Sequence, residues 1–316
     1  MSKKCLFSAP HSFLADIKEN FNSILPTEFK EIWNFSEIKY SKNIIVWVVN
    51  PGQKFVINDE ILNFFPNLEL IITPSTGKNH IDEDECLKKN IKVFGLLDAR
   101  DILSSITASS EFTFLLILNA LRKLDFAVLE VSEGRWRDNE DLLRGYELNG
   151  RKIGIVGLGR IGSNIARWTT EFGAEVYYYD PYKNNKLYNR KKIKEIFSDS
   201  DIICISCILN KETKGLINYE LLSNMKKNAV FINTSRGEIV NEKDLSRVLN
   251  QRIDIHACVD VLSGEVKGQQ HDSPLMRLQK KGRITITPHI AGATFDSQIK
   301  AANGALELFR KNFIKL

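Results

Sequence analysis

A histidine, an arginine and a glutamate stand near the ends of three apolar runs, where strands of a parallel sheet present side chains for chemistry. Arg236 and His289 each follow such a run closely, and Glu265 lies five residues after Asp260, where a third run ends. An arginine can bind a carboxylate through two hydrogen bonds, and a histidine can exchange a proton near neutral pH. With an acid that keeps the imidazole charged and oriented, this set suits the reduction of a 2-keto acid.

A second chemical signal is the segment Gly157-Leu158-Gly159-Arg160-Ile161-Gly162, which follows the apolar run 152–156. We predict that Gly157 allows a tight turn and that Gly159 lets the backbone approach a pyrophosphate. Gly162 would let a helix pack closely on the preceding strand. The helix begins near Arg160 and Ile161, and its free N–H groups would face the phosphates. All five residues are therefore predicted to bind a dinucleotide.

An acid at the expected place strengthens this prediction. Asp180 stands eighteen residues after Gly162, at the end of the apolar run 175–179. Such an acid accepts hydrogen bonds from the ribose hydroxyls of adenosine and would repel a 2′-phosphate, which favours NAD over NADP. The stretch 182–194 is rich in lysine and arginine and contains no acid before position 195, so NADP stays open as the alternative.

The elements that would position these residues alternate between strands and helices. Nearly continuous apolar runs predict six parallel strands of one doubly wound sheet, at 152–156, 175–179, 202–206, 230–234, 256–260 and 284–287. Helical patterns lie between them at 161–172, 221–227 and 242–250. The first hundred residues predict a smaller alternation, with strands at 5–8, 44–49, 70–73 and 91–94 and helices at 13–21, 58–65 and 82–89.

Two further helices would connect these parts. A helix at 104–124 leads into the larger sheet, and a helix at 295–313 returns after the last strand. The predicted fold is therefore α/β, with a Rossmann-type doubly wound parallel sheet inserted into a smaller flavodoxin-like α/β domain. The dinucleotide-binding domain would span 101–288, and the substrate-binding domain would comprise 1–100 plus 289–316.

Composition and length favour a cytoplasmic enzyme. The net charge of +5 over 316 residues does not call for nucleic acid, and the longest apolar stretch, 112–118, is too short for a membrane span. Five cysteines lie mostly within apolar runs, which indicates reduced thiols. Cys204 and Cys207 have CxxC spacing but belong to a buried-strand pattern, so no metal site is predicted. His80 and His256 are interpreted as structural.

Taken in order, these segments resemble the D-isomer-specific 2-hydroxyacid dehydrogenases. The resemblance rests on the glycine segment, on Asn233-Thr234-Ser235-Arg236-Gly237, on Asp260 with Glu265, and on Thr287-Pro288-His289-Ile290-Ala291-Gly292. It implies that Arg236 binds and polarises the substrate, that His289 is the acid/base catalyst, and that Glu265 is the partner of His289.

The resemblance also implies further binding residues. Asp260 would accept a hydrogen bond from the nicotinamide carboxamide, and Thr234 would belong to the cofactor site. The segment 74–82 resembles the family's substrate loop, in which the backbone N–H groups of Thr76 and Gly77 would hold the substrate carboxylate. The cofactor implied is NAD.

We therefore expect an NAD-dependent oxidoreductase that transfers a hydride between NADH/NAD and a 2-keto/D-2-hydroxy acid. A non-catalytic NAD-binding module similar to the family's corepressors stays open, because such proteins can retain the same three residues. Formate or phosphite oxidation on the same scaffold also stays open. The helix at 104–124 has more apolar surface than a peripheral helix needs, which predicts a homodimer. Neither a nucleic acid nor a membrane is expected as a partner.

Overall fold

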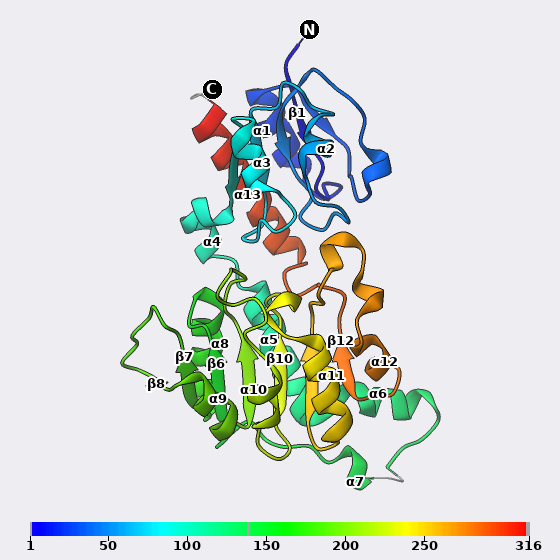
Figure 1. Cartoon of the computed structure of the whole chain (residues 1–316), viewed down its shortest axis with the longest axis vertical. Coiled ribbons are helices and arrows are strands. Elements are labelled where there is room, and N and C mark those ends of the chain that lie inside the picture. The colour runs from blue at the N-terminus through cyan, green and yellow to red at the C-terminus, as the bar shows by residue number, and fades with distance from the viewer. Residues whose placement is uncertain (1, 138–139, 314–316) are drawn as a thin grey trace. The chain divides into compact units, whose positions relative to one another are not determined.

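The computed structural model, which describes residues 2–137 and 140–313, forms two compact units, each built on its own parallel sheet (Figure 1). The first unit comprises the chain up to Ile106, the short segment Glu265–Gly268 and the residues from Ala293 onward. The second unit comprises Thr107–Gly264 and Gln269–Gly292. The sequence placed the divisions after positions 100 and 288, and two of the observed divisions fall a few residues later. The segment Glu265–Gly268, predicted within the dinucleotide-binding domain, instead belongs to the first unit.

The first unit has five parallel strands in the order β2-β1-β3-β4-β5. The strands are β1 (Lys4–Phe7), β2 (Thr27–Phe29), β3 (Ile44–Val48), β4 (Leu70–Thr73) and β5 (Lys92–Gly95). This order is the flavodoxin-like arrangement expected from the sequence. The sequence missed β2, because three partly exposed residues at a sheet edge leave no apolar run.

Helices cover both faces of this first sheet. The first face is packed by α1 (Ala15–Ile24) and α13 (Phe295–Phe313), where the rings of Phe21 and Phe309 stack with centroids 5.7 Å apart. The second face is covered by α2 (Asp59–Leu62) and α3 (Glu83–Lys88). Both β3 and β4 contribute residues to each of the two cores, as expected for strands that are buried on both sides.

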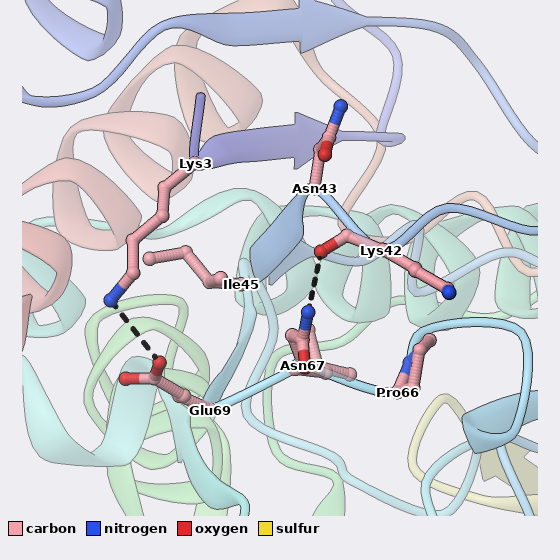
Figure 2. Close-up of a pocket in the computed structure, with 8 residues that line it drawn as sticks. Lys3, Lys42, Asn43, Ile45, Pro66, Asn67 and Glu69 are labelled. Carbon is pink, nitrogen blue, oxygen red and sulfur yellow. Dashed lines mark hydrogen bonds and ion pairs between the residues drawn. The ribbon is translucent and has the colours of Figure 1, made fainter. Parts of the chain in front are cut away.

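A cavity of about 550 Å³ lies at the amino-terminal edge of this sheet (Figure 2). Lys3 and Glu69 form an ion pair across it, with Nζ 3.6 Å from Oε1, and the side-chain amide of Asn67 donates to the carbonyl oxygen of Lys42 at 2.8 Å. Open α/β sheets bind their ligands at the carboxyl edge. Within this unit, the cavity is therefore at the opposite edge of the sheet from Thr76 and Gly77, which follow β4.

The second unit has seven parallel strands in the order β12-β11-β10-β9-β6-β7-β8. They are β6 (Lys152–Val156), β7 (Glu175–Tyr179), β8 (Asn189–Arg190), β9 (Ile202–Ile205), β10 (Val230–Asn233), β11 (His256–Val259) and β12 (Ile284–Ile286). Strand order reverses between β6 and β9, which confirms the predicted Rossmann-type sheet. All six predicted strands are present. The seventh, β8, consists of two exposed polar residues that give no apolar signal.

The helices of the second unit also form two layers. The first layer contains α5 (Ala108–Arg122) and α8 (Arg160–Glu171). The opposite layer contains α9 (Ile193–Asp199), α10 (Tyr219–Ser223), α11 (Glu242–Gln251) and α12 (Leu275–Gln279). Two more helices, α6 (Leu124–Ser132) and α7 (Glu140–Leu143), follow α5.

The single helix predicted at 104–124 is wrong in its bounds. In the structure α4 (Arg100–Ser104) ends before α5 begins, and α5 ends because Lys123 takes the left-handed conformation with φ of +52°. Among the described residues, the stretch Arg100–Arg122 is long and apolar enough to cross a membrane when judged by length and composition alone. Seven residues of α5 are buried, and the helix packs on α8 and β10 as a core helix.

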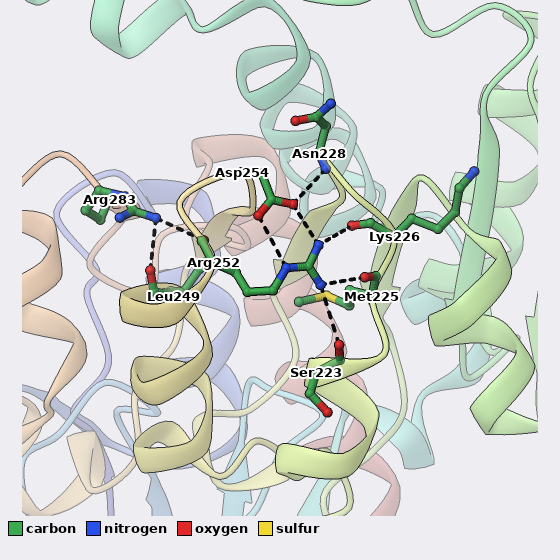
Figure 3. A network of polar contacts seen from close by, with 8 residues as sticks. All are labelled: Ser223, Met225, Lys226, Asn228, Leu249, Arg252, Asp254 and Arg283. Carbon is green, nitrogen blue, oxygen red and sulfur yellow. Dashed lines mark hydrogen bonds and ion pairs between the residues drawn. The ribbon is translucent and has the colours of Figure 1, made fainter.

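A network around Arg252 joins elements at the amino-terminal edge of the second sheet (Figure 3). The Arg252 guanidinium donates to the carbonyl oxygens of Met225 and Lys226 at 2.7 and 3.1 Å. It also donates to Asp254 Oδ2 at 2.7 Å, and this contact holds the pKa of Asp254 below its ordinary value. Arg252 therefore ties the connection before β10 to the start of β11, far from the carboxyl edge.

Arg252→Ala is expected to lower the free energy of unfolding by about 1–3 kcal/mol, because two carbonyl oxygens and a carboxylate lose their donor. Since the folded-state pKa of Asp254 is depressed, its contribution is present above the ordinary aspartate range and is lost as pH falls through the depressed value. Urea unfolding should therefore show a wild-type advantage that shrinks in acid. Arg277→Ala, an exposed arginine of the same unit, is the control. Equal stability of both variants at neutral pH would contradict this role.

Candidate active site

Two glycines of the glycine-rich loop are required by contacts within the second unit. Gly157, which follows β6, has φ of +95°, a conformation that favours glycine. A Cβ at Gly157 would lie 2.6 Å from the backbone nitrogen of Cys207, and a Cβ at Gly162 would lie 2.1 Å from the carbonyl oxygen of Gly157. Both positions therefore require glycine, because β6, α8 and the residues after β9 approach one another closely.

Gly159 differs, because a Cβ there would meet no atom within 4 Å. The N–H groups of Gly159, Ile161 and Gly162 donate to no residue within 2–137 or 140–313. No acid lies in the first turn of the 12-residue helix α8, so its positive dipole end is not neutralised from within the helix. Open space before several amide donors fits the pyrophosphate of a dinucleotide. Arg160 opens the helix, and its partial burial lowers the pKa of its guanidinium.

Asp180 follows β7 and is held against the glycine loop. Its Oδ2 accepts from the Leu158 N–H at 2.9 Å. Its Oδ1 accepts from the N–H groups of Tyr182 and Lys183 at 2.9 and 3.0 Å. The carboxylate therefore lies beside the loop, where a contact with an adenosine ribose would require it. It also shapes that loop, which is a role that sequence reasoning missed.

The turn that carries Arg236 is built by Asn233, the last residue of β10. Asn233 is 1% exposed. Its Oδ1 accepts from the Ser235 N–H at 3.1 Å, and its Nδ2 donates to the Arg236 carbonyl oxygen at 3.0 Å. The Arg236 guanidinium donates to the Ser235 carbonyl oxygen at 2.6 Å. Asn233 therefore folds the backbone that presents the arginine, and an asparagine ending an apolar run before Ser and Gly was the available signal.

Thr234 lies in the same turn but faces α5. Its hydroxyl oxygen is 2.7 Å from the hydroxyl oxygen of Thr113. Because the Thr113 hydroxyl donates to the Ser109 carbonyl oxygen at 2.7 Å, Thr234 donates to Thr113. This contact fixes Thr234 against α5, and its predicted contact with the cofactor stays a prediction.

Asp260, which follows β11, holds the segment that carries His289. Its two carboxylate oxygens accept from the Thr287 hydroxyl at 2.6 Å, from the Ile290 N–H at 2.9 Å and from the Ala291 N–H at 2.8 Å. The Asp260 carbonyl oxygen accepts from the His289 N–H at 2.8 Å. Burial raises the pKa of Asp260, while these hydrogen bonds oppose that shift. The predicted contact of Asp260 with a nicotinamide carboxamide stays a prediction.

His289 itself is exposed and has φ of +55°, a left-handed conformation that is uncommon outside glycine. The clamp by Asp260 keeps the backbone in this conformation. Strained backbone of this kind often occurs at functional positions. The structure thus presents the imidazole on a rigid support at the end of β12.

The predicted substrate loop lies in the first unit, after β4. The Ser75 hydroxyl donates to the Gly77 carbonyl oxygen at 2.8 Å, which holds the bend. The N–H groups of Thr76 and Gly77 donate to no residue that the structure describes, so both are available to an acceptor. His80 is 2% exposed and its Nε2 lies 3.1 Å from Thr73 Oγ1, which agrees with a structural role.

The structure places the remaining predicted residues as follows. Glu265 also belongs to the first unit, where it begins a short turn that closes with a Gly268 N–H bond to the Glu265 carbonyl oxygen at 2.9 Å. In the second unit, the carboxyl edge of one sheet gathers the glycine loop, Asp180, Thr234, Arg236, Asp260 and His289. In the part of the chain that the structure describes, no three His, Cys, Asp or Glu residues are grouped to hold a metal ion.

His256 lies apart from this edge, at the start of β11. Its Nε2 is 3.1 Å from the Thr285 hydroxyl, and burial lowers the pKa of the imidazole. These contacts are those of a structural histidine.

Comparisons with known proteins agree with this geometry. Residues 114–291, more than half of the chain, match the family model described as "D-isomer specific 2-hydroxyacid dehydrogenase, NAD binding domain". The chain is 29% identical to a glyoxylate reductase of Korarchaeum cryptofilum, over 94% of this chain and 88% of the relative. It is 36% identical to the human glyoxylate reductase/hydroxypyruvate reductase, over 76% of this chain and 74% of the relative.

A solved structure extends the similarity to the whole fold. The D-lactate dehydrogenase of Aquifex aeolicus, complexed with NAD and lactic acid, superposes with a TM-score of 0.84 at 27% identity. The match covers 99% of this chain and 96% of that one. With the matched family model and the parallel sheet that carries the glycine loop, these similarities show that the chain belongs to the D-isomer-specific 2-hydroxyacid dehydrogenases and is an NAD-dependent oxidoreductase of that family.

Proposed function

We propose that this enzyme reduces a small 2-keto acid to a D-2-hydroxy acid, or catalyses the reverse reaction, with His289 as the acid/base catalyst. One observation carries the proposal. The exposed His289 is held in a left-handed conformation by Asp260, at the carboxyl edge of the sheet that also carries the glycine loop. A rigidly supported imidazole at that edge suits proton transfer beside a nicotinamide.

Each remaining residue has a role in this proposal. Bound NADH supplies the hydride. The Arg236 guanidinium binds the substrate carboxylate and polarises the carbonyl group, because it can donate two parallel hydrogen bonds. His289 donates a proton to the oxygen of the former carbonyl group, and Glu265 keeps the imidazole oriented. The amides of Thr76 and Gly77, which have no acceptor among the described residues, also bind the carboxylate.

Steady-state NADH oxidation with a panel of 2-keto acids tests the proposal. Glyoxylate and hydroxypyruvate head the panel, because they give two similar relatives their names. We expect saturable turnover of at least one acid. Tight NADH binding without any turnover would favour the non-catalytic binding module instead. NAD reduction by formate or phosphite, without 2-keto acid turnover, would favour a different chemistry on this scaffold.

The choice between NAD and NADP is proposed to depend on Asp180. Asp180→Ala removes the acceptor of three backbone N–H groups and the negative charge beside the ribose site. We expect the Kd for NADH to rise about tenfold or more, and the difference from NADPH to narrow. Fluorescence titration with both cofactors measures this, with the exposed Asp272→Ala as control. A wild type that already prefers NADPH would refute this reading and favour the lysine-rich stretch after Asp180.

We also propose that the enzyme is a homodimer whose interface includes the helix that follows the one indicated by the sequence. Seven residues of α5 are buried inside its own unit, whereas Leu115 is 50% exposed. The next helix, α6, instead exposes an apolar surface, which we call the α6 surface: Leu124, Val128, Leu129 and Val131, each 51–60% exposed. The buried residue of α6 is Glu130, 7% exposed and held by two hydrogen bonds from Arg135 at 2.7 and 2.5 Å.

This inverted arrangement is unusual for a helix in contact with water, which normally buries its apolar side. A second copy of the chain would cover the α6 surface symmetrically. Light scattering at micromolar concentration should give about twice the 36.1 kDa mass of one chain. Val128→Glu should shift this mass to that of a monomer, whereas Leu187→Glu, at an 83% exposed position elsewhere in the unit, should not. A monomeric wild type would refute the proposal.

A reducing, cytoplasmic location is also proposed. All five cysteines are free, and four of them are buried. Burial raises the pKa of Cys5 to about 12, which keeps this thiol protonated and unreactive.

A further inference from the structure

We propose that Glu242 is a positioning residue that fixes Glu265 by clamping the backbone immediately before it. The proposal rests on the role assigned above to Glu265 as the partner of His289. Among residues 2–137 and 140–313, the carboxylate of Glu242 accepts hydrogen bonds from Ser263 and Ser273, which belong neither to the proposed substrate residues nor to the glycine loop. Its action on the reaction would therefore pass through the chain that leads to Glu265.

The clamp begins with a buried carboxylate at the start of α11. Glu242 is the first residue of this helix, and it is 8% exposed. Its Oε1 accepts from the Ser263 N–H at 2.5 Å, and its Oε2 accepts from the Ser273 hydroxyl at 2.5 Å. Both oxygens are thus used, and one of them holds the backbone two residues before Glu265.

Neighbouring contacts hold the same backbone more completely. Glu238 Oε1 accepts from the Gly264 N–H at 3.3 Å. A Cβ at Gly237 would lie 2.1 Å from the carbonyl carbon of Leu262, so the two segments are in direct backbone contact. Gly264 has φ of +78°, and its carbonyl oxygen accepts from the Gln269 N–H at 3.0 Å. The turn that begins with Glu265 is therefore anchored on both sides.

The clamping residues come from the segment that also carries Arg236. Gly237 follows Arg236 directly, and Glu238 and Glu242 come within the next few residues. One short stretch of chain therefore presents the proposed substrate-binding arginine and fixes the support of the proposed histidine partner. A shift of the backbone that carries Arg236 would therefore move the backbone before Glu265, and the reverse also holds, because the two backbones touch at Gly237 and Leu262.

The role of Glu242 depends on hydrogen bonding and not on packing alone. Burial raises the pKa of Glu242, so the fold holds this carboxyl at an energetic cost that its hydrogen bonds reduce only in part. A residue kept for core stability alone would be better apolar at such a position. The acceptor function of the side chain, rather than its volume, is what the geometry uses.

Two substitutions separate these properties. Glu242→Met keeps the volume but removes the acceptor, whereas Glu242→Gln can still accept from Ser263 through its amide oxygen. Each is compared with wild type in the full-length enzyme, alone and together with Glu265→Gln, and Glu307→Met at an exposed position is the control. The measurements are thermal stability, NADH affinity by fluorescence, and kcat against pH with an accepted 2-keto acid.

We expect Glu242→Met to lower kcat by about 10- to 100-fold with NADH affinity unchanged, because small displacements of catalytic groups have effects of that size. It should also shift the pH profile in the same direction as Glu265→Gln. Glu242→Gln should restore most of the activity. In the Glu265→Gln background, Glu242→Met should have little further effect, because both changes then act on the same group.

The outcomes distinguish this inference from the proposed function. Equal losses from Glu242→Met in both backgrounds, or wild-type activity of Glu242→Met, would overturn the inference while Glu265→Gln still showed its own effect. Wild-type kcat and pH profile for Glu265→Gln would instead refute the role of Glu265. If Glu242→Met does not fold, Ser273→Ala replaces it, since that change removes one anchor of Glu242. It should give a smaller loss with the same dependence on Glu265.

Discussion

Replacement of His289 by alanine is expected to lower kcat for 2-keto acid reduction by about 10²–10⁴-fold. Hydride delivery to the carbonyl carbon leaves an alkoxide, which needs a proton at neutral pH, and we propose that the imidazolium of His289 supplies it. NADH affinity should stay close to that of wild type, because the proposed cofactor contacts are those of the glycine loop and Asp180. Stopped-flow or steady-state rates at saturating substrate, with fluorescence titration of NADH, measure both quantities.

His271→Ala is a matched control, because His271 is an exposed histidine of the same unit. Glu265→Gln should reduce the maximal rate less than His289→Ala does, and it should move the alkaline limb of the reduction profile to lower pH. A His289→Ala enzyme whose kcat lies within a few-fold of wild type would show that another group donates the proton. The assignment of the catalytic site would then fail.

Two alanine substitutions in the glycine loop are expected to affect different properties, one the affinity for NADH and the other the stability of the fold. Gly159→Ala should fold like wild type, because its Cβ meets no atom within 4 Å, yet its Kd for NADH should rise about tenfold or more. Gly162→Ala should destabilise the protein by about 1–3 kcal/mol, because its Cβ would lie 2.1 Å from the Gly157 carbonyl oxygen. Each variant controls for the other in thermal denaturation and NADH titration.

Comparing the two variants separates the contribution of the glycine loop to NADH binding from its contribution to folding stability. A Gly159→Ala enzyme that binds NADH as tightly as wild type would contradict the assignment of this loop to the pyrophosphate. A Gly162→Ala enzyme of unchanged stability would show that α8 can move away from β6 at little cost.

Apolar runs made most of the sheet predictable from the sequence. Every central strand is buried on both faces and reads as a continuous apolar segment, as Ile202–Ile205 shows. The edge strands β2 and β8 lack this signal, because they are short and partly or fully exposed. The start of α5 was also missed, because the predicted helix began at 104, where the separate helix α4 ends in the structure.

The sequence predicted those parts of the candidate site that are recognisable from residue types and their spacing. It did not predict those that depend on contacts between distant segments. Glycine spacing indicated the loop, and the tertiary contacts show why Gly157 and Gly162 are needed there. Glu242 was missed as a support, because its partner Ser263 lies 21 residues away and meets it only when the chain is folded. Asn233 was missed although its partners lie within its own turn, at Ser235 and Arg236. The sequence could name candidate reactive groups, but it did not identify Asn233 and Glu242, which hold the backbone beside them.

The first unit is built from segments that lie far apart in the sequence, and this has a consequence for how the chain folds during synthesis. Its sheet is covered on one face by α13, whose Arg310 bonds Asn20 across 290 residues of sequence at 3.2 Å. During synthesis, Phe21 and its neighbours leave the ribosome long before Phe309 exists to stack on them. The second unit, by contrast, is nearly continuous in sequence and holds its own core. All five strands of this sheet precede residue 96, so the face that α13 covers stays only partly covered until that helix is made. We expect this face to be the aggregation-prone part of the nascent chain, which chaperones would protect.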